Sequence, residues 1–182
     1  MAKRLCLILG LCILAGGLAF TFLHTTRSSG MPANDGIGGL WKSIDEKTGK
    51  PQCVVAIYNY QGVYYGRIIG TYDDAGRMKE TIYNPQGRAP GVVGSPFYCG
   101  LDFIWGLKNE GDAKYAGRIM DPEKGSVYHA ELWVQNGNLI VRGELLFFGR
   151  NQTWLPALKT DFPKGFKFPD TSKFTPTIPH EK

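Results

Sequence analysis

The sequence reads VYHAELWVQNGNLIVRGELLF at residues 127–147, two strand-like runs separated by Asn136-Gly137. Asn-Gly is the preferred pair for a two-residue type I′ turn, so these two residues set the register of a hairpin. One face then carries the apolar pairs Val134–Leu139, Leu132–Val141, Ala130–Gly143 and Tyr128–Leu145. The other face carries Trp133–Ile140, Glu131–Arg142 and His129–Glu144. Because a one-residue slip would scramble both faces, the pattern predicts an antiparallel hairpin with one buried side.

Similar runs flank this hairpin on both sides. They are rich in β-branched and aromatic residues, and Gly, Asn, Asp or Pro separates them. The other predicted strands are Leu40–Asp45, Gln52–Tyr58, Val63–Thr71, Leu101–Leu107, Lys114–Met120 and Asn151–Leu155. A series of hairpins of this length removes its edges by closing. We therefore expect an all-β domain, an antiparallel meander closed into a small barrel of about eight strands.

Two segments do not follow this pattern of short strands and turns. Residues 73–98 contain Pro85, Pro90 and Pro96 and are longer than most loops of compact domains, which predicts a functional, mobile or partly structured loop. Residues 158–182 alternate Pro with Phe and predict an extended tail. Such a tail can pack across the barrel, extend freely, or bind a protein partner in a polyproline-like conformation.

The chain opens with an export signal. Lys3 and Arg4 precede an uncharged, apolar run from Leu5 to Leu23, which is typical of a secretory signal. Small residues at Gly17-Leu18-Ala19 suit cleavage, but the run is also long enough to span a bilayer. We expect a signal peptide or signal-anchor at residues 1–30, a linker at 31–38, the barrel at 39–157 and the tail at 158–182. The protein is then periplasmic or secreted, and its only contact with the membrane is through the N-terminal segment.

The charge of the chain does not indicate a nucleic-acid partner. The formal net charge is +5, but Lys3, Arg4 and Arg27 precede Met31 without an acid among them, so the remainder is closer to neutral. No stripe of Lys and Arg recurs along any predicted strand, as a surface that follows phosphates would require.

Two of the four cysteines, Cys53 and Cys99, fall in the barrel. In an oxidising compartment they can form a disulfide, which would stabilise the fold by about 4 kcal/mol. The alternative is two small buried side chains. We expect no metal site, because no Cys-x-x-Cys is present and His129 is the only histidine in the barrel.

Several short motifs together resemble one known family. They include Gly39-Leu40-Trp41-Lys42-Ser43-Ile44-Asp45, Gly117-Arg118-Ile119-Met120-Asp121-Pro122 and Gly149-Arg150-Asn151-Gln152-Thr153-Trp154. The chain resembles the bacterial envelope family known as domain of unknown function 2147, from about Gly39 to Trp154. The resemblance implies a lipocalin-like barrel in a secreted or periplasmic protein with no established reaction.

The resemblance also implies structural roles for three residues. Trp41 would be the aromatic residue at the barrel floor, Arg150 would cover it through a cation–π contact, and Trp154 would complete the closure. The chain departs from the pattern where Leu155-Pro156 replaces an expected basic residue, and where Cys99 stands without a second cysteine. The tail from Leu158 lies outside the resemblance.

Four tyrosines are candidate ligand contacts, because Tyr offers an apolar wall with a polar tip. They are Tyr58, Tyr65, Tyr115 and Tyr128. The alternative is an ordinary aromatic core. We identify no catalytic residue and no cofactor motif, since a Gly-x-Ser-x-Gly elbow, a phosphate loop and a dinucleotide fingerprint are all missing from the sequence.

Two functions follow from this pattern. The first is a non-enzymatic barrel of the bacterial envelope that carries a small, largely apolar ligand between its walls, gated by residues 73–98. The second is a barrel with a filled core that acts as a structural or protein-interaction module through its tail. A cavity wide enough for a ligand favours the first; a packed interior with exposed Phe162 to Phe174 favours the second.

Overall fold

Antiparallel strands account for nearly all the regular structure. The computed structural model describes residues 36–145 and 148–182, so the segment predicted as a signal or anchor and most of the linker lie outside it. The described residues form nine strands: β1 (Gly39–Ile44), β2 (Pro51–Tyr60), β3 (Val63–Tyr72), β4 (Met78–Thr81), β5 (Asp102–Gly111), β6 (Lys114–Met120), β7 (Val127–Gln135), β8 (Asn138–Leu145) and β9 (Phe148–Pro156). Among these residues, no helix has both the length and the apolar character needed to cross a bilayer.

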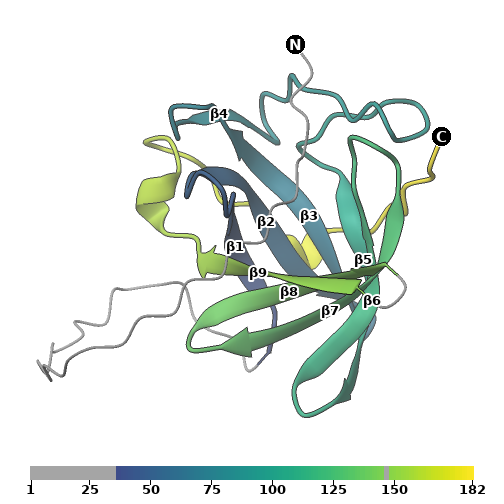
Figure 1. Ribbon diagram of the computed structural model, residues 1–182. Coiled ribbons are helices and arrows are strands. Elements are labelled where there is room, and N and C mark those ends of the chain that lie inside the picture. Colours follow the sequence, from purple (N-terminus) through teal and green to yellow (C-terminus); the bar gives the residue numbers. More distant parts are fainter. Residues whose placement is uncertain (1–35, 146–147) are drawn as a thin grey trace, which may run out of the picture.

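The strands close into a barrel (Figure 1). Their order is β2-β1-β9-β8-β7-β6-β5-β3, and a further pairing between β2 and β3 joins the two ends of this series. The predicted all-β meander of eight strands is thereby confirmed. The ninth strand, β4, pairs only with one end of β3. The sequence prediction missed it because its four residues fall within the segment expected to be a loop.

The β7–β8 hairpin has the register that the sequence predicts. The β7–β8 ladder runs from His129 opposite Glu144 to Gln135 opposite Asn138, and Leu132 faces Val141. Asn136 and Gly137 both have positive φ, 52° and 77°, as a type I′ turn requires. The apolar face of the hairpin lies inside the barrel, where Leu132, Leu139 and Val141 join the inner core.

The inner core fills the barrel. Its members include Ile57, Ile68, Ile104, Leu107 and Leu139, all buried. Gly66 pairs with Ile104 across the β3–β5 ladder, and a Cβ added at Gly66 would lie 2.9 Å from Cβ of Ile104 and 3.0 Å from Cδ1 of Ile57. Close packing of this kind leaves little free volume between the walls.

A second apolar cluster, the outer core, lies between the outer surface of the barrel and the tail. Val54, Ala56 and Ile69 contribute from β2 and β3, and Phe162 contributes from the tail. The tail includes two short 3₁₀ turns, η1 (Lys159–Asp161) and η2 (Thr171–Lys173). Of the three arrangements left open by the sequence, the structure shows the tail packed across the barrel (Figure 1).

Candidate ligand groove

Both ends of the barrel interior are closed by described residues. At one end Ile37 is buried, and its carbonyl accepts a 2.8 Å hydrogen bond from Nε1 of Trp41. Tyr64 and Tyr115 meet beside this segment with ring centroids 5.2 Å apart. At the other end the long loop, residues 82–101, contributes Ala89, Val92, Cys99 and Leu101 to the inner core. The ligand space expected between the barrel walls is therefore occupied by side chains.

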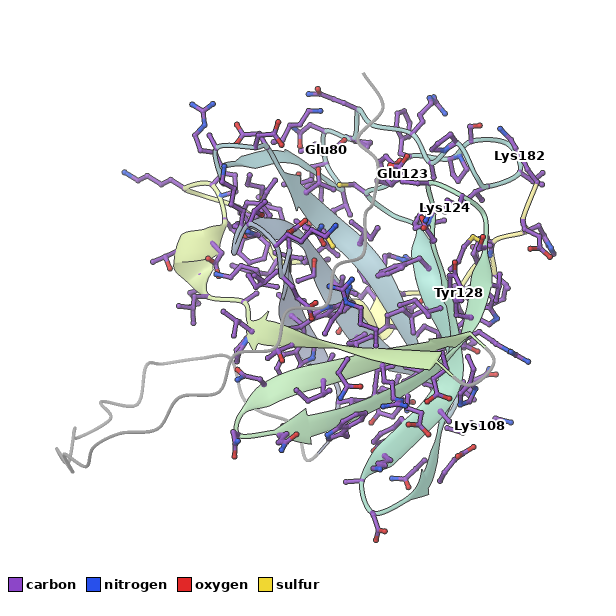
Figure 2. The ribbon with its side chains drawn as sticks, viewed as in Figure 1. Glu80, Lys108, Glu123, Lys124, Tyr128 and Lys182 are labelled. Carbon is purple, nitrogen blue, oxygen red and sulfur yellow. The ribbon has the colours of Figure 1, made fainter. Side chains whose placement is uncertain are left out.

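Several hydrogen bonds fasten the long loop, which overlaps residues 73–98, the segment that was predicted to act as a gate. The Glu80 carboxylate accepts hydrogen bonds from the backbone N–H groups of Gln86 and Gly87. Burial alone would raise the pKa of Glu80, but these donors outweigh it and lower the pKa below its ordinary value. Tyr98 donates to Glu123. Figure 2 shows Glu80, Glu123, Lys124 and Lys182 together around this end of the barrel.

The end of the chain is bonded to the same loop. Val92 and Glu181 form an isolated antiparallel bridge. The Val93 N–H donates to the carbonyl of His180 over 2.9 Å, and the N–H of Lys182 donates to the carbonyl of Gly91 over 3.2 Å. The tail therefore covers the outer surface of the barrel and also anchors the loop at its end.

A buried ion pair fastens the tail to the barrel wall. Asp102 is only 1% exposed and binds Arg67 through both oxygens, at 2.9 Å and 2.6 Å. The same carboxylate accepts hydrogen bonds from the Tyr58 hydroxyl and from the backbone N–H of Thr177 in the tail. The Arg67 guanidinium also lies 4.4 Å from the centre of the Phe174 ring. Burial would lower the pKa of Arg67, but the hydrogen bond to Asp102 and the charge of that carboxylate raise it above its ordinary value.

The four candidate tyrosines do not share one site. Tyr58 and Tyr65 lie on the outer surface: their rings stack at 5.7 Å, and Tyr58 meets Phe174 edge-on at 5.1 Å. Both were expected to line the inner wall of the barrel, and that prediction is wrong. Val55 and Ile57 of β2 face inward, so Tyr58, which follows Ile57, lies on the opposite face of the strand. Tyr115 is buried in the inner core. Tyr128 is half-buried on β7 and shares the strand face of the inward-facing Ala130 and Leu132.

Trp41 and Trp154 are buried in the inner core, and Trp154 stacks on Phe103. Arg150 does not cover Trp41, so this part of the expected closure is wrong. Trp41 pairs with Pro156 on β9, and Arg150 lies six residues further along that strand, or roughly 20 Å at about 3.3 Å per residue. Arg150 is instead 58% exposed and forms an ion pair with Glu46. Nε1 of Trp41 instead donates a hydrogen bond to the carbonyl of Ile37.

The two cysteines are free thiols, so the predicted disulfide between Cys53 and Cys99 is not formed. The Cys53 sulfur contacts the Ser43 hydroxyl at 3.1 Å, across the β1–β2 ladder. Burial raises the pKa of Cys53 to about 11 and that of Cys99 to about 12. Cys99 is buried and Cys53 is half-buried, and both thiols stay protonated, which is close to the alternative of two small buried side chains that the sequence left open. Within the described residues, no three His, Cys, Asp or Glu side chains are placed to hold a metal ion.

A groove that is open to solvent lies on the outer surface, between β4 and the tail. We call it the tail groove: it is lined by Met78–Thr81 of β4, by Tyr83 and Asn84, and by Pro163–Lys167 of the tail. Its volume is about 390 Å³, within the range of small-molecule sites. A second hollow of about 410 Å³ adjoins it and shares Met78 and Pro163 with it.

Aromatic side chains build one wall of the tail groove. Phe166 stacks on Phe162 at 4.6 Å and meets Phe168 edge-on at 5.2 Å. Tyr83 lies 5.6 Å from Phe166 and donates its hydroxyl hydrogen to the carbonyl of Lys167 over 2.8 Å. Because Tyr83 is 59% exposed, its ring face is accessible from solvent.

A family model matches residues 39–155, and its description is an uncharacterized protein conserved in bacteria, DUF2147. The chain belongs to this family. No curated protein matches the sequence.

One solved structure resembles the chain and is described as "Protein HP1028 from the human pathogen Helicobacter pylori belongs to the lipocalin family". The TM-score is 0.52 at 16% identity, over 68% of this chain and 84% of that one. At this identity the likeness shows the fold alone, a lipocalin-like barrel.

The family match ends at Leu155, before the tail that forms one wall of the groove. Sequence reasoning missed the groove because it depends on which barrel strands the tail crosses. One signal was present: residues 53–58 read CVVAIY, an almost continuous apolar run. Such a run is typical of a strand buried on both faces, and it indicated that something covers the outside of the barrel.

Proposed function

We propose that this member of the family is a non-enzymatic, exported protein of the bacterial envelope that binds a small, largely apolar ligand. The site is the tail groove and not the space between the barrel walls. The single observation that carries the proposal is the contrast between a filled interior and an open groove lined by Met78, Tyr83 and Phe166.

Three further observations support the proposal. The basic and then apolar N-terminal sequence is typical of export. The neighbouring solved structure is described as a member of the lipocalin family, and barrels of that kind can hold one small ligand. The most deeply buried acid, Asp102, is engaged by Arg67, Tyr58 and Thr177 and so serves the packing of the tail.

The test is native mass spectrometry of the full chain purified from the cell envelope of a bacterial host. We expect a small molecule that stays bound in the native spectrum and is lost on denaturation. The variant Tyr83→Ala should retain less of it, because part of the apolar wall is removed. Trp133→Ala is the matched control, since Trp133 is a half-buried aromatic residue on β7 that does not line the groove.

A second function is supported by the filled interior itself, namely an envelope module that binds another protein. Phe162 is buried and Phe166, Phe168 and Phe174 are half-buried, so such a partner would meet the packed tail and not a free segment. A clean apo mass for the wild-type chain, with no small molecule retained, would favour this function over the first.

A further inference from the structure

We infer that the ligand of the tail groove is an anionic amphiphile with a single long apolar chain, its acidic head held by Lys164 and Lys167. The inference rests on the proposed function and names the ligand class for the same groove. It follows from the shape of the groove, from the chemistry of its floor and from the charges along its rim.

The shape favours an elongated ligand. The tail groove and the adjoining hollow share Met78 and Pro163, so the two hollows lie next to each other along β4 and the tail. The adjoining hollow is lined further on by Gly76, Arg77 and Phe162. Two adjoining hollows that open to solvent suit an alkyl chain that extends from one to the other better than a compact ring system.

The floor of the groove suits hydrocarbon. Met78 belongs to the outer core, and its flexible thioether adapts to irregular apolar surfaces. Phe166 also packs in that core and presents a ring beside Tyr83. An alkyl chain on these side chains would extend the outer core with further apolar contact.

The cations of the tail groove outnumber its acid. Glu80 lines the groove and is anionic at neutral pH, because hydrogen bonds from Thr71 and from two backbone N–H groups lower its pKa despite its burial. Lys79, Lys164 and Lys167 line the same groove, so its lining keeps a net positive charge. In the adjoining hollow, Asp161 forms an ion pair with Lys42 at 2.6 Å.

The lysines at the rim keep their charge uncompensated. Lys164 and Lys167 line the groove and are exposed, and neither forms an ion pair with any residue the structure describes. Arg77, by contrast, pairs with Asp73 at 3.0 Å. Two free ammonium groups beside an apolar floor complement a ligand that has a carboxylate or phosphate at one end of its chain.

The experiment is titration calorimetry of the full chain with dodecanoate, dodecyl phosphate and dodecanol, each below its aggregation concentration. We expect at least one of the two anions to bind about tenfold more tightly than dodecanol, and to lose that advantage at high salt. Inorganic phosphate alone should not compete, because it lacks the chain. Whichever anion binds more tightly identifies the head group.

A pair of double variants tests the lysines. Lys164→Gln with Lys167→Gln should weaken binding of the anion about three- to tenfold and leave dodecanol unchanged. The control, Lys108→Gln with Lys114→Gln, removes the same charge from exposed positions on β5 and β6. It should change the affinity for neither the anion nor dodecanol. Figure 2 shows Lys108 at the end of the barrel opposite Glu80.

The outcomes separate the inference from the proposed function. Equal affinity for dodecanol and both anions, unaffected by the Lys164 and Lys167 changes, would overturn the inference and leave the groove as an apolar site. Absence of binding for all three compounds, with a clean apo mass from the envelope, would overturn the proposed function as well. Competition by inorganic phosphate alone would show a simple anion site and also overturn the inference.

Discussion

The barrel has an apolar core on each side of the β2–β3 wall, and the two are built differently. The inner core is enclosed by regular strands, with Ile57 and Ile68 facing it. The outer core is covered by an irregular, proline-containing tail, with Val54 and Ile69 facing it. Strands at fixed spacing close the inner core tightly, whereas the tail leaves a groove beside β4. In this molecule the irregular tail, and not the regular strands, leaves a groove large enough for a small molecule.

The largest expected effect comes from breaking the attachment of the tail. Asp102→Asn leaves the Arg67 guanidinium buried beside a neutral amide, which should lower the free energy of unfolding by about 3–5 kcal/mol. Urea denaturation followed by tryptophan fluorescence measures it. The double variant Arg67→Met with Asp102→Leu should lower the free energy of unfolding by clearly less, because no charge is left unpaired. A cost below about 1 kcal/mol for the single variant would show that the ion pair contributes little to holding the tail.

The second largest loss of stability is expected from a truncation in the inner core. Leu132 is fully buried on β7, so Leu132→Ala should lower the free energy of unfolding by about 3 kcal/mol through lost contacts and a cavity that the strands cannot close. Val134→Ala on the same strand is the control, since Val134 is exposed and its truncation should cost less than about 0.5 kcal/mol. Similar costs at the two positions would contradict a closely packed interior.

The matching truncation of a side chain in the outer core should lower the free energy of unfolding by a smaller amount. Phe168 is half-buried and meets Phe162 edge-on at 4.8 Å. Phe168→Ala should lower the free energy of unfolding by about 1–2 kcal/mol, because the tail can relax into the space and part of the ring is already in water. A loss as large as that of Leu132→Ala in the same urea assay would mean that the tail is as rigid as the strands.

The smallest expected effect concerns the long loop and depends on pH. The pKa of Glu80 is lower in the folded chain than its ordinary value of 4.5, so its contribution to stability is fully present above that value. The contribution is lost as the pH falls through the folded pKa. Glu80→Gln should therefore cost about 1 kcal/mol at pH 7, and the difference from wild type should shrink towards pH 3. A difference that is constant over this range would rule out the carboxylate charge as the cause.

The sequence predicted best where its signals are local. The β7–β8 register follows from Asn136-Gly137 and from alternation over a few residues, and it was confirmed. The contact predicted for Arg150 depended on how β9 pairs with β1, a register between strands far apart in the chain. The orientation of Tyr58 was ambiguous because β2 is buried on both sides, so alternation does not show which face is inner. The groove depends on the path of the tail, for which no periodic pattern exists.

The hydrogen bonds of the tail also bear on how the chain folds. Thr177 reaches Asp102 across 75 residues, and Thr175 accepts from Arg67 across 108. Contacts this distant in sequence form late and slowly, because a long loop must close first. The barrel strands are complete at Pro156, yet Asp102 gains its hydrogen bond from the tail only once Thr177 has been added to the chain. A chain interrupted shortly before Thr177 would therefore keep the Phe side chains that cover the outer core, but would lack the bond that fastens the tail to the buried ion pair.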